Sequence, residues 1–267
     1  MRCLPLRQQI SKSMTEILDK YDTITLDEMR AIRLMNRIDT KFVTTVPVLS
    51  RLLRLASDDY FVQQVNGDRT SPYYTLYFDT PDCAMYQRHE VGHLERQKIR
   101  VRSYMNVGLS FLEVKTKNNH GRTKKKRISL EDFTPEQRSA FNVQHAAYDD
   151  FIRTHLRYDP LTLSQQIENR FDRITLVNRA KTERLTIDTN LRFHNIATGN
   201  YRFMEGLVVI ELKRDGLCSS PILPLLCQLR IRPHGFSKYC VGSALTNEDL
   251  RRNRIKPRLH SIEKMMK

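Results

Sequence analysis

The 267-residue sequence has little of what marks several common protein classes. Its five cysteines, Cys3, Cys83, Cys218, Cys227 and Cys240, are odd in number, scattered and without a CxxC pair. This usage argues against a zinc site or a disulfide framework, so we expect a reducing compartment, the cytoplasm. No apolar run approaches the ~18 residues that a membrane span needs. The polar first residues are not typical of a signal peptide.

Local motifs of catalysis and of nucleic-acid recognition are also missing. There is no HExxH, no nucleophile elbow and no Walker glycine loop, and the eight histidines are scattered. No helix-turn-helix, zinc-finger or RNP-like pattern is present, so no specific nucleic acid is expected as a partner. Any phosphate must therefore be bound by side chains and not by a backbone cradle.

No internal repeat or low-complexity linker divides the chain, which suits a single domain over residues 1–267 with its core at about residues 30–245. Residues 1–29 form an N-terminal helical segment in this interpretation. Residues 251–267 form a basic C-terminal tail, expected to be solvated or partly disordered. The sequence does not indicate an oligomeric state.

Positive charge is in clear excess. Lys and Arg number 45 against 30 for Asp and Glu, which gives a net charge of +15. Such a balance predicts an anionic partner, namely nucleic acid, a phosphate-rich small molecule or an acidic membrane surface. With 40% hydrophobic and 28% charged residues, the chain has the composition of a globular protein.

The charges alternate along predicted strands, most clearly in residues 94–130. Lys98, Arg100 and Arg102 share one face of a strand, opposite Ile99 and Val101. The next two strands show the same alternation, with Glu113, Lys115 and Lys117 on one and Lys125 and Arg127 on the other. One interpretation is a solvated sheet face over a core. The other is a cationic face that lines a cavity for a polyanion.

Four more segments repeat this pattern, at residues 37–42, 161–173, 183–191 and 206–215. Helices are predicted between the strands, at residues 10–21, 26–35, 48–59, 134–156, 219–229 and 243–253, and a short helix or loop is predicted at residues 83–94. If the charged faces point inward, the strands close into a barrel and the helices cover its apolar outside. A dense cationic lumen requires an anionic ligand, and an extended phosphate chain fits because Arg and Lys both bind phosphate well.

Three carboxylates, Glu113, Asp188 and Glu211, lie on the same rows as the cations. In the simplest interpretation they pair with neighbouring Lys and Arg side chains. For Glu211 we favour a functional role, because a carboxylate in a phosphate-filled lumen is a suitable ligand for Mg²⁺ or Mn²⁺. Such an ion offsets charge that develops during phosphoryl transfer.

Nine short segments resemble, in order, the motifs of a known family: RIDTKF, YFDTPD, KIRVRSY, FLEVKTK, KKKRISL, ENR, RLTIDT, VVIELK and FSKY. They resemble the VTC domain, the polyphosphate polymerase domain of the vacuolar transporter chaperone complex, in the triphosphate tunnel metalloenzyme superfamily. The resemblance implies an α+β fold, an eight-stranded antiparallel β-barrel tunnel with a charged lumen and flanking helices. It also implies transfer of the terminal phosphate of ATP to a polyphosphate chain, with Mn²⁺ or Mg²⁺.

Site residues follow from this resemblance. The predicted phosphate-binding set is Lys41, Arg100, Arg102, Lys115, Lys125, Arg127, Arg170, Arg184, Lys213 and Lys238. Within it, Lys41, Arg100, Arg102 and Lys115 are assigned to catalysis together with Glu211, which is also the predicted metal ligand.

Two departures from the family pattern narrow the expected activity. Hydrolytic relatives begin with an ExExK strand, and this chain has Arg37, Asp39 and Lys41 at those positions. Loss of the first glutamate disfavours a tripolyphosphatase or nucleoside triphosphatase, which remains the alternative enzyme. A polyphosphate-binding module without catalysis is the third hypothesis. The SPX domain and membrane helices of eukaryotic relatives are not seen, so we expect neither inositol phosphate sensing nor translocation.

Overall fold

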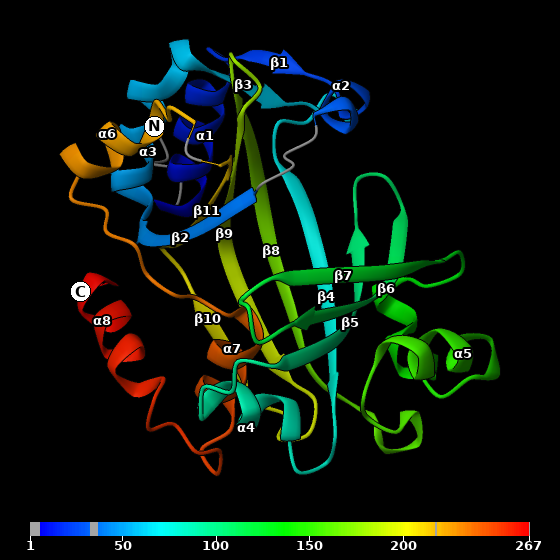
Figure 1. The fold of residues 1–267 in the computed structure, drawn as a ribbon. Coiled ribbons are helices and arrows are strands. Elements are labelled where there is room, and N and C mark those ends of the chain that lie inside the picture. Colours follow the sequence, from blue (N-terminus) through cyan, green and yellow to red (C-terminus); the bar gives the residue numbers. More distant parts are fainter. Residues whose placement is uncertain (1–5, 33–36, 217, 267) are drawn as a thin grey trace.

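A single sheet, antiparallel along its main path, organises the chain in the computed structural model, which describes residues 6–32, 37–216 and 218–266 (Figure 1). Its main path follows the strand order β2-β11-β9-β8-β4-β5-β6-β7. The strands of this path are β2 (Arg37–Thr45), β4 (Ser71–Asp79), β5 (Arg96–Tyr104), β6 (Leu109–Lys117), β7 (Thr123–Leu130), β8 (Ser164–Asn178), β9 (Glu183–Asn195) and β11 (Leu207–Asp215). The short strands β1 (Asp22–Ile24), β3 (Tyr60–Gln63) and β10 (Tyr201–Met204) add to it.

The helices lie largely where the sequence predicts them. They are α1 (Leu6–Leu18), α2 (Leu26–Ala31), α3 (Val46–Ala56), α4 (Ala84–Glu90), α5 (Ala146–His155), α6 (Ile222–Gln228), α7 (Lys238–Thr246) and α8 (Lys256–Met266). Thr25 and Glu28 form a reciprocal capping box at the start of α2. The predicted helix at 134–156 is shorter, because Pro135–Ala140 forms a 3₁₀ turn before α5.

Helices cover the convex side of the curled sheet in two groups (Figure 1). In the first, α1, α3 and α6 pack on β8, β9 and β11, with Leu49 and Leu53 against Ile187, Ile210 and Leu212. In the second, α5 packs on β4, β5 and β6. Full burial of each such side chain contributes roughly 1.5–3 kcal/mol. The apolar face of each alternating strand is therefore covered by helices, which leaves the charged face on the concave side.

Helix α7 covers one end of the concave side. It packs on Ile167 and Phe193 of β8 and β9, and its Gly242 allows the close approach. A Cβ atom at Gly242 would lie 2.4 Å from the Phe193 ring and 2.7 Å from the Ile167 side chain. This packing places Lys238, at the first turn of α7, over the concave face.

The eight-stranded antiparallel sheet with flanking helices is confirmed, but the sheet curls without closing. Strands β2 and β7 are the two ends of the hydrogen-bonded path, and no ladder joins them in the described part of the chain. In place of the expected closed tunnel, the sheet is a half-barrel that stays open between these edges, and we call its concave side the groove. Lysines along β7 make that edge unattractive for pairing with another sheet.

The basic C-terminal tail differs from expectation, because it is ordered as α8. Ile255, Leu259 and Ile262 recur at helical spacing and are buried against the apolar cluster around α7. The cationic residues between them face solvent. The predicted helix at 243–253 is replaced by α7, which ends at Thr246, and by a turn before α8.

Candidate functional site

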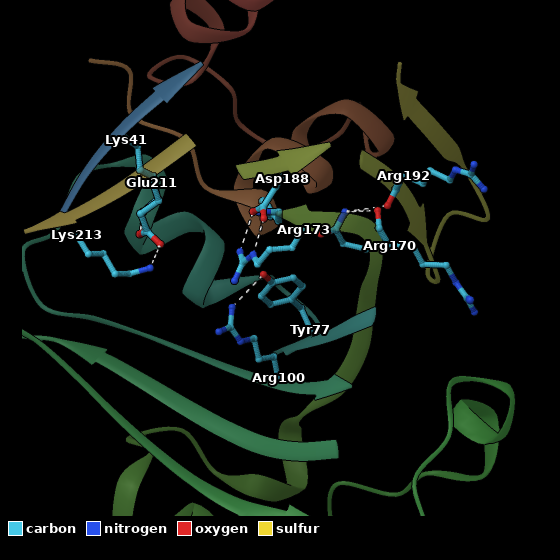
Figure 2. Close-up of polar contacts among 11 residues, drawn as sticks. Lys41, Tyr77, Arg100, Arg170, Arg173, Asp188, Arg192, Glu211 and Lys213 are labelled. Carbon is cyan, nitrogen blue, oxygen red and sulfur yellow. Dashed lines mark hydrogen bonds and ion pairs between the residues drawn. The ribbon is translucent and has the colours of Figure 1, made fainter. Parts of the chain in front are cut away.

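Strand register brings the predicted site residues together on the concave face. On one wall, Lys41 of β2 lies opposite Glu211 of β11, and Lys213 lies opposite Arg184 of β9. Residues directly opposite on adjacent strands point to the same face. Lys41, Glu211 and Lys213 therefore gather at one place (Figure 2).

The other wall is formed by β5, β6 and β7. Arg100 lies opposite Glu113, which in turn lies opposite Arg127. One step further along the strands, Lys115 lies opposite both Lys98 and Lys125. The inward set of β7 is thus Lys125 and Arg127, as the alternation predicts. Arg102 continues the row of β5, facing the Tyr73 ring at 5.9 Å.

Arg170 is the predicted phosphate ligand that the structure places elsewhere. It lies opposite Tyr74, and its guanidinium stacks 5.0 Å from the Tyr74 ring on the convex face. Its neighbour Phe171 occupies the concave face, and successive side chains of a strand alternate. The assignment of Arg170 to the lumen is therefore wrong, and Figure 2 shows its side chain pointing away from the cluster.

Arg173 takes the place that was predicted for Arg170. Its guanidinium donates to both oxygens of Asp188, at 2.6 and 2.9 Å, and its side chain is only 13% exposed. A signal for it exists in the sequence, because Arg173 alternates with Ile174 and Leu176, which belong to the convex core. The ENR motif ends at Arg170, three positions earlier, and an odd spacing places that residue on the opposite face of the strand.

Three carboxylates of the concave face, Glu113, Asp188 and Glu211, are each held between two cations, an arrangement that we call a carboxylate clamp. Glu211 accepts from Lys41 and, at 2.6 Å, from Lys213. Burial by itself raises the pKa of Glu211, but Lys213 and Lys41 outweigh burial and hold it well below its usual range. Glu211 is therefore ionised at neutral pH, and its clamp keeps a net positive charge.

The other two clamps have the same composition. Glu113, with a fully buried side chain, accepts from Arg100 at 2.8 and 2.9 Å and from Lys125 at 3.0 Å. Asp188 accepts from Arg173 and from Lys238. Although burial opposes it, these cations lower the pKa of both carboxyls far below their ordinary values. The pairing that the sequence suggested for Glu113 and Asp188 is thus present, and Glu211 shares it.

Several described basic side chains of the concave face have no carboxylate partner. Among the described residues, Arg102 and Lys115 have no hydrogen bond or ion pair, and the Arg102 Nε atom is buried. Arg127 stacks 4.2 Å from the Phe111 ring. The surrounding positive charge, led by Arg100 and Arg102, lowers the pKa of the buried Tyr77 hydroxyl even though burial alone would raise it. The groove therefore has a strongly positive potential and lacks an internal counter-charge for these cations.

A divalent ion could be held on this face by Glu211 together with phosphate oxygens of a ligand. The described residues contain no cluster of three or more His, Cys, Asp or Glu side chains that could hold a metal. Glu211 offers one carboxylate, and its two oxygens already accept from Lys41 and Lys213. Because Mg²⁺ is often bound by one or two carboxylates together with substrate phosphates, an ion fits as a bridge between Glu211 and phosphate oxygens.

Because the pKa of Lys115 is lowered, we expect anion binding to depend on pH. Its side chain reaches solvent inside the groove, yet the enclosing walls and then Arg100 lower its pKa to about 7, with Glu211 opposing. Only the protonated amine attracts phosphate, so affinity is expected to fall as pH rises through 7, by at most about 10-fold per pH unit. Calorimetric titration with tripolyphosphate between pH 6 and 8.5 measures this slope.

The Lys115→Met variant is the control for that titration. Tripolyphosphate itself also titrates in this pH range, so part of the pH dependence of affinity comes from the ligand. The variant keeps that part and removes the part that comes from the Lys115 amine. Identical pH slopes in the wild type and in Lys115→Met would contradict the assignment to Lys115.

The sequence model of one protein family, described as the VTC domain, matches residues 36–247. The chain belongs to this family. The match covers every strand of the sheet path and also α7, so all three carboxylate clamps of this VTC domain lie within it. A comparison with curated protein sequences finds no match.

Solved structures with a similar course of the chain share little sequence with this VTC domain. A Hippeastrum protein, titled a candidate adenylyl cyclase with a dominant triphosphatase activity, is 14% identical, with a TM-score of 0.48 over 79% of this chain and 96% of that one. A Bacillus halodurans protein titled a candidate adenylate cyclase is 15% identical, with a TM-score of 0.47 over 76% and 96%. A Vibrio parahaemolyticus protein, also described as a candidate adenylate cyclase, is 11% identical, with a TM-score of 0.46 over 78% of this chain and 99% of that one. These similarities carry no conclusion about activity.

No helix among the described residues of this VTC domain is long and apolar enough to cross a membrane.

Proposed function

We propose that this VTC domain is a phosphotransferase that transfers the terminal phosphate of ATP to a polyphosphate chain bound in its groove. The observation that carries the proposal is the concave face, where every carboxylate clamp keeps a net positive charge and Arg102 and Lys115 remain unpaired. Cations that lie in rows along several strands suit an extended polyanion better than a compact one.

The residues have separate roles in this proposal. Arg100, Arg102 and Lys115, with Lys41, hold the phosphates around the transferred group and offset its charge in the transition state. A terminal oxygen of the chain forms a bond to the γ-phosphorus, the bond to the β–γ bridging oxygen breaks, and ADP leaves. The attacking phosphate is already ionised, so no general base is needed. Bound Mn²⁺ or Mg²⁺ supplies additional neutralisation of phosphate oxygens at Glu211.

The first strand supports transfer over hydrolysis. Arg37 stands where hydrolytic relatives have a glutamate, and its Nε donates to Asp39 Oδ1 at 2.6 Å. Asp39, the one acidic residue left on this strand, is thus already paired with Arg37. A hydrolase would be expected to have two free carboxylates here, and this strand, which the structure describes in full, has none. A tripolyphosphatase and a non-catalytic binding module are therefore outcomes of the test.

Incubation of the purified protein with ATP and Mn²⁺, followed by gel electrophoresis of the products, tests the proposal. We expect long-chain polyphosphate together with ADP. Formation of ADP and inorganic phosphate without a chain would show a hydrolase. Chain binding without any ATP turnover would show a binding module, and either result contradicts the proposed transfer.

We also propose that the protein works in the cytoplasm. The four described cysteines, Cys83, Cys218, Cys227 and Cys240, are free thiols, which suits a reducing compartment. Fluorescence microscopy of the tagged chain in its own cell tests this location.

A further inference from the structure

A second basic cavity, of about 250 Å³, lies next to the end of the groove that α7 covers. It is bounded by the end of α4, the first residue of β5, the loop before α7 and the segment that leads into α8. Its cationic lining residues are Arg96, Arg254 and Arg258. Within the described chain, none of the three forms an ion pair with a carboxylate.

The cavity is built by specific contacts of the C-terminal segment. Nη1 of Arg254 donates to the carbonyl of Val91 at 2.6 Å, and Gly92 leaves room for its guanidinium. A Cβ atom at Gly92 would lie 1.5 Å from Nη1 of Arg254, and the φ of +84° also favours glycine there. Nη1 of Arg96 donates to the carbonyl of His93 at 2.8 Å. Two of the guanidinium groups are therefore held in place by backbone carbonyls.

Glu90 is the one carboxylate among the described lining residues, and it accepts hydrogen bonds from backbone N–H groups. Its side chain is buried, and Oε1 accepts from the backbone N–H groups of Arg254 at 2.5 Å and Ile255 at 3.2 Å. Glu90 thus anchors the C-terminal segment and leaves the lining with an excess of positive charge.

His89 adds an unpaired polar atom to this cavity. Its Nδ1 atom is buried and finds no hydrogen-bond partner in the described part of the chain. Burial, and then the charges of Lys98 and Arg96, lower the pKa of His89 to about 2, so its imidazole is neutral. A bound anion with hydroxyl or oxygen atoms can satisfy Nδ1 in either tautomer.

The cavity continues the cationic row of β5. Arg96, Lys98 and Arg100 share one face of the strand, with Arg96 about 13 Å from Arg100 at the usual rise per residue. Ser237 lines the cavity and accepts from Nζ of Lys98 at 2.7 Å. A chain of phosphates that follows this row past Lys98 therefore reaches Arg96 and then Arg254 and Arg258.

We propose that this cavity binds phosphate groups, and that they belong to the polyphosphate chain where it leaves the groove. The statement that these phosphates belong to polyphosphate rests on the proposed function, which takes polyphosphate to be the ligand of the groove. Arg254 and Arg258 lie beyond residue 247, where the family match ends. The site is thus completed by residues outside the matched family segment.

Calorimetric titration with two ligands, tripolyphosphate and a long polyphosphate, tests the proposal. The double variant Arg254→Ala/Arg258→Ala is compared with Arg251→Ala/Lys256→Ala, which removes the same charge from exposed positions of the same segment outside the cavity. We expect the first variant to bind the long chain about 10-fold or more weakly and tripolyphosphate nearly as the wild type does. Thermal melting of both variants verifies folding.

The outcomes separate the sources of the phosphate. If the wild type binds two tripolyphosphates and the cavity variant binds one, the site takes a separate phosphate compound. Unchanged affinity for both ligands, or equal weakening in both variants, overturns the site. Wild-type protein that binds polyphosphate without extending it would contradict the proposed function and leave the cavity in place.

Discussion

Replacement of Glu211 by glutamine is expected to reduce ATP turnover by about 100-fold or more, without weakening polyphosphate binding. The carboxylate is ionised and accepts from Lys41 and Lys213, and in the proposed function it would hold a divalent ion next to the phosphates. Its loss removes that ligand. Its loss also frees both lysines, so the groove becomes more positive and affinity for the anionic chain is retained or increased.

Glu113→Gln is the matched control for this experiment, because it also opens one carboxylate clamp. It frees Arg100 and Lys125 but leaves the Glu211 clamp intact. We expect a lower melting temperature in Glu113→Gln, since an unpaired buried guanidinium is costly, and a much smaller loss of turnover in the folded protein. Steady-state kinetics with titrated Mn²⁺ measure both variants. Equal losses in the two would reduce Glu211 to a structural ion pair.

Replacement of Arg102 by alanine is expected to weaken tripolyphosphate binding by about 10- to 100-fold, whereas Arg170→Ala should leave it nearly unchanged. The Arg102 guanidinium lies on the concave face with no carboxylate partner in the described chain, so its full charge is available to phosphate. Arg170 stacks on Tyr74 of the convex face, where no chain in the groove can reach it.

The two arginine variants test the orientation of the whole sheet. Each removes one guanidinium, so a general effect of net charge would lower affinity equally in both. Titration at two salt concentrations is informative, because screening should remove a long-range effect of net charge but leave most of the effect of a direct phosphate contact. Stronger loss in Arg170→Ala than in Arg102→Ala would mean that the anion binds the convex face.

Much of the site could be predicted from single strands. The alternation of Lys98, Arg100 and Arg102 with Ile99 and Val101 correctly separates the two faces of β5. The same rule applied to β8 identifies Arg173, opposite Ile174 and Leu176. The ENR motif by itself predicts Arg170 in the lumen, whereas the alternation along β8 places Arg170 on the convex face.

Other features depend on contacts between distant segments. The clamps join Lys41 to Glu211 and Lys238 to Asp188 across the fold, and no local pattern specifies such partners. The ordering of the basic tail as α8 depends on burial of Leu259 and Ile262, while the cations of this helix stay exposed to solvent. The second basic cavity is formed by segments far apart in the chain, and Glu90 joins two of them by accepting from the backbone N–H of Arg254.

The family, most of the strands and the charged face of nearly every strand follow from the sequence alone, because side-chain alternation with period 2 is a local property of the backbone. The predicted inward direction of this face is confirmed, since helices pack on the apolar side and leave the charged side concave. Only the tertiary structure decided that the sheet remains open between β2 and β7 and which cations are left without a carboxylate. These outcomes depend on interactions between residues that are far apart in the chain.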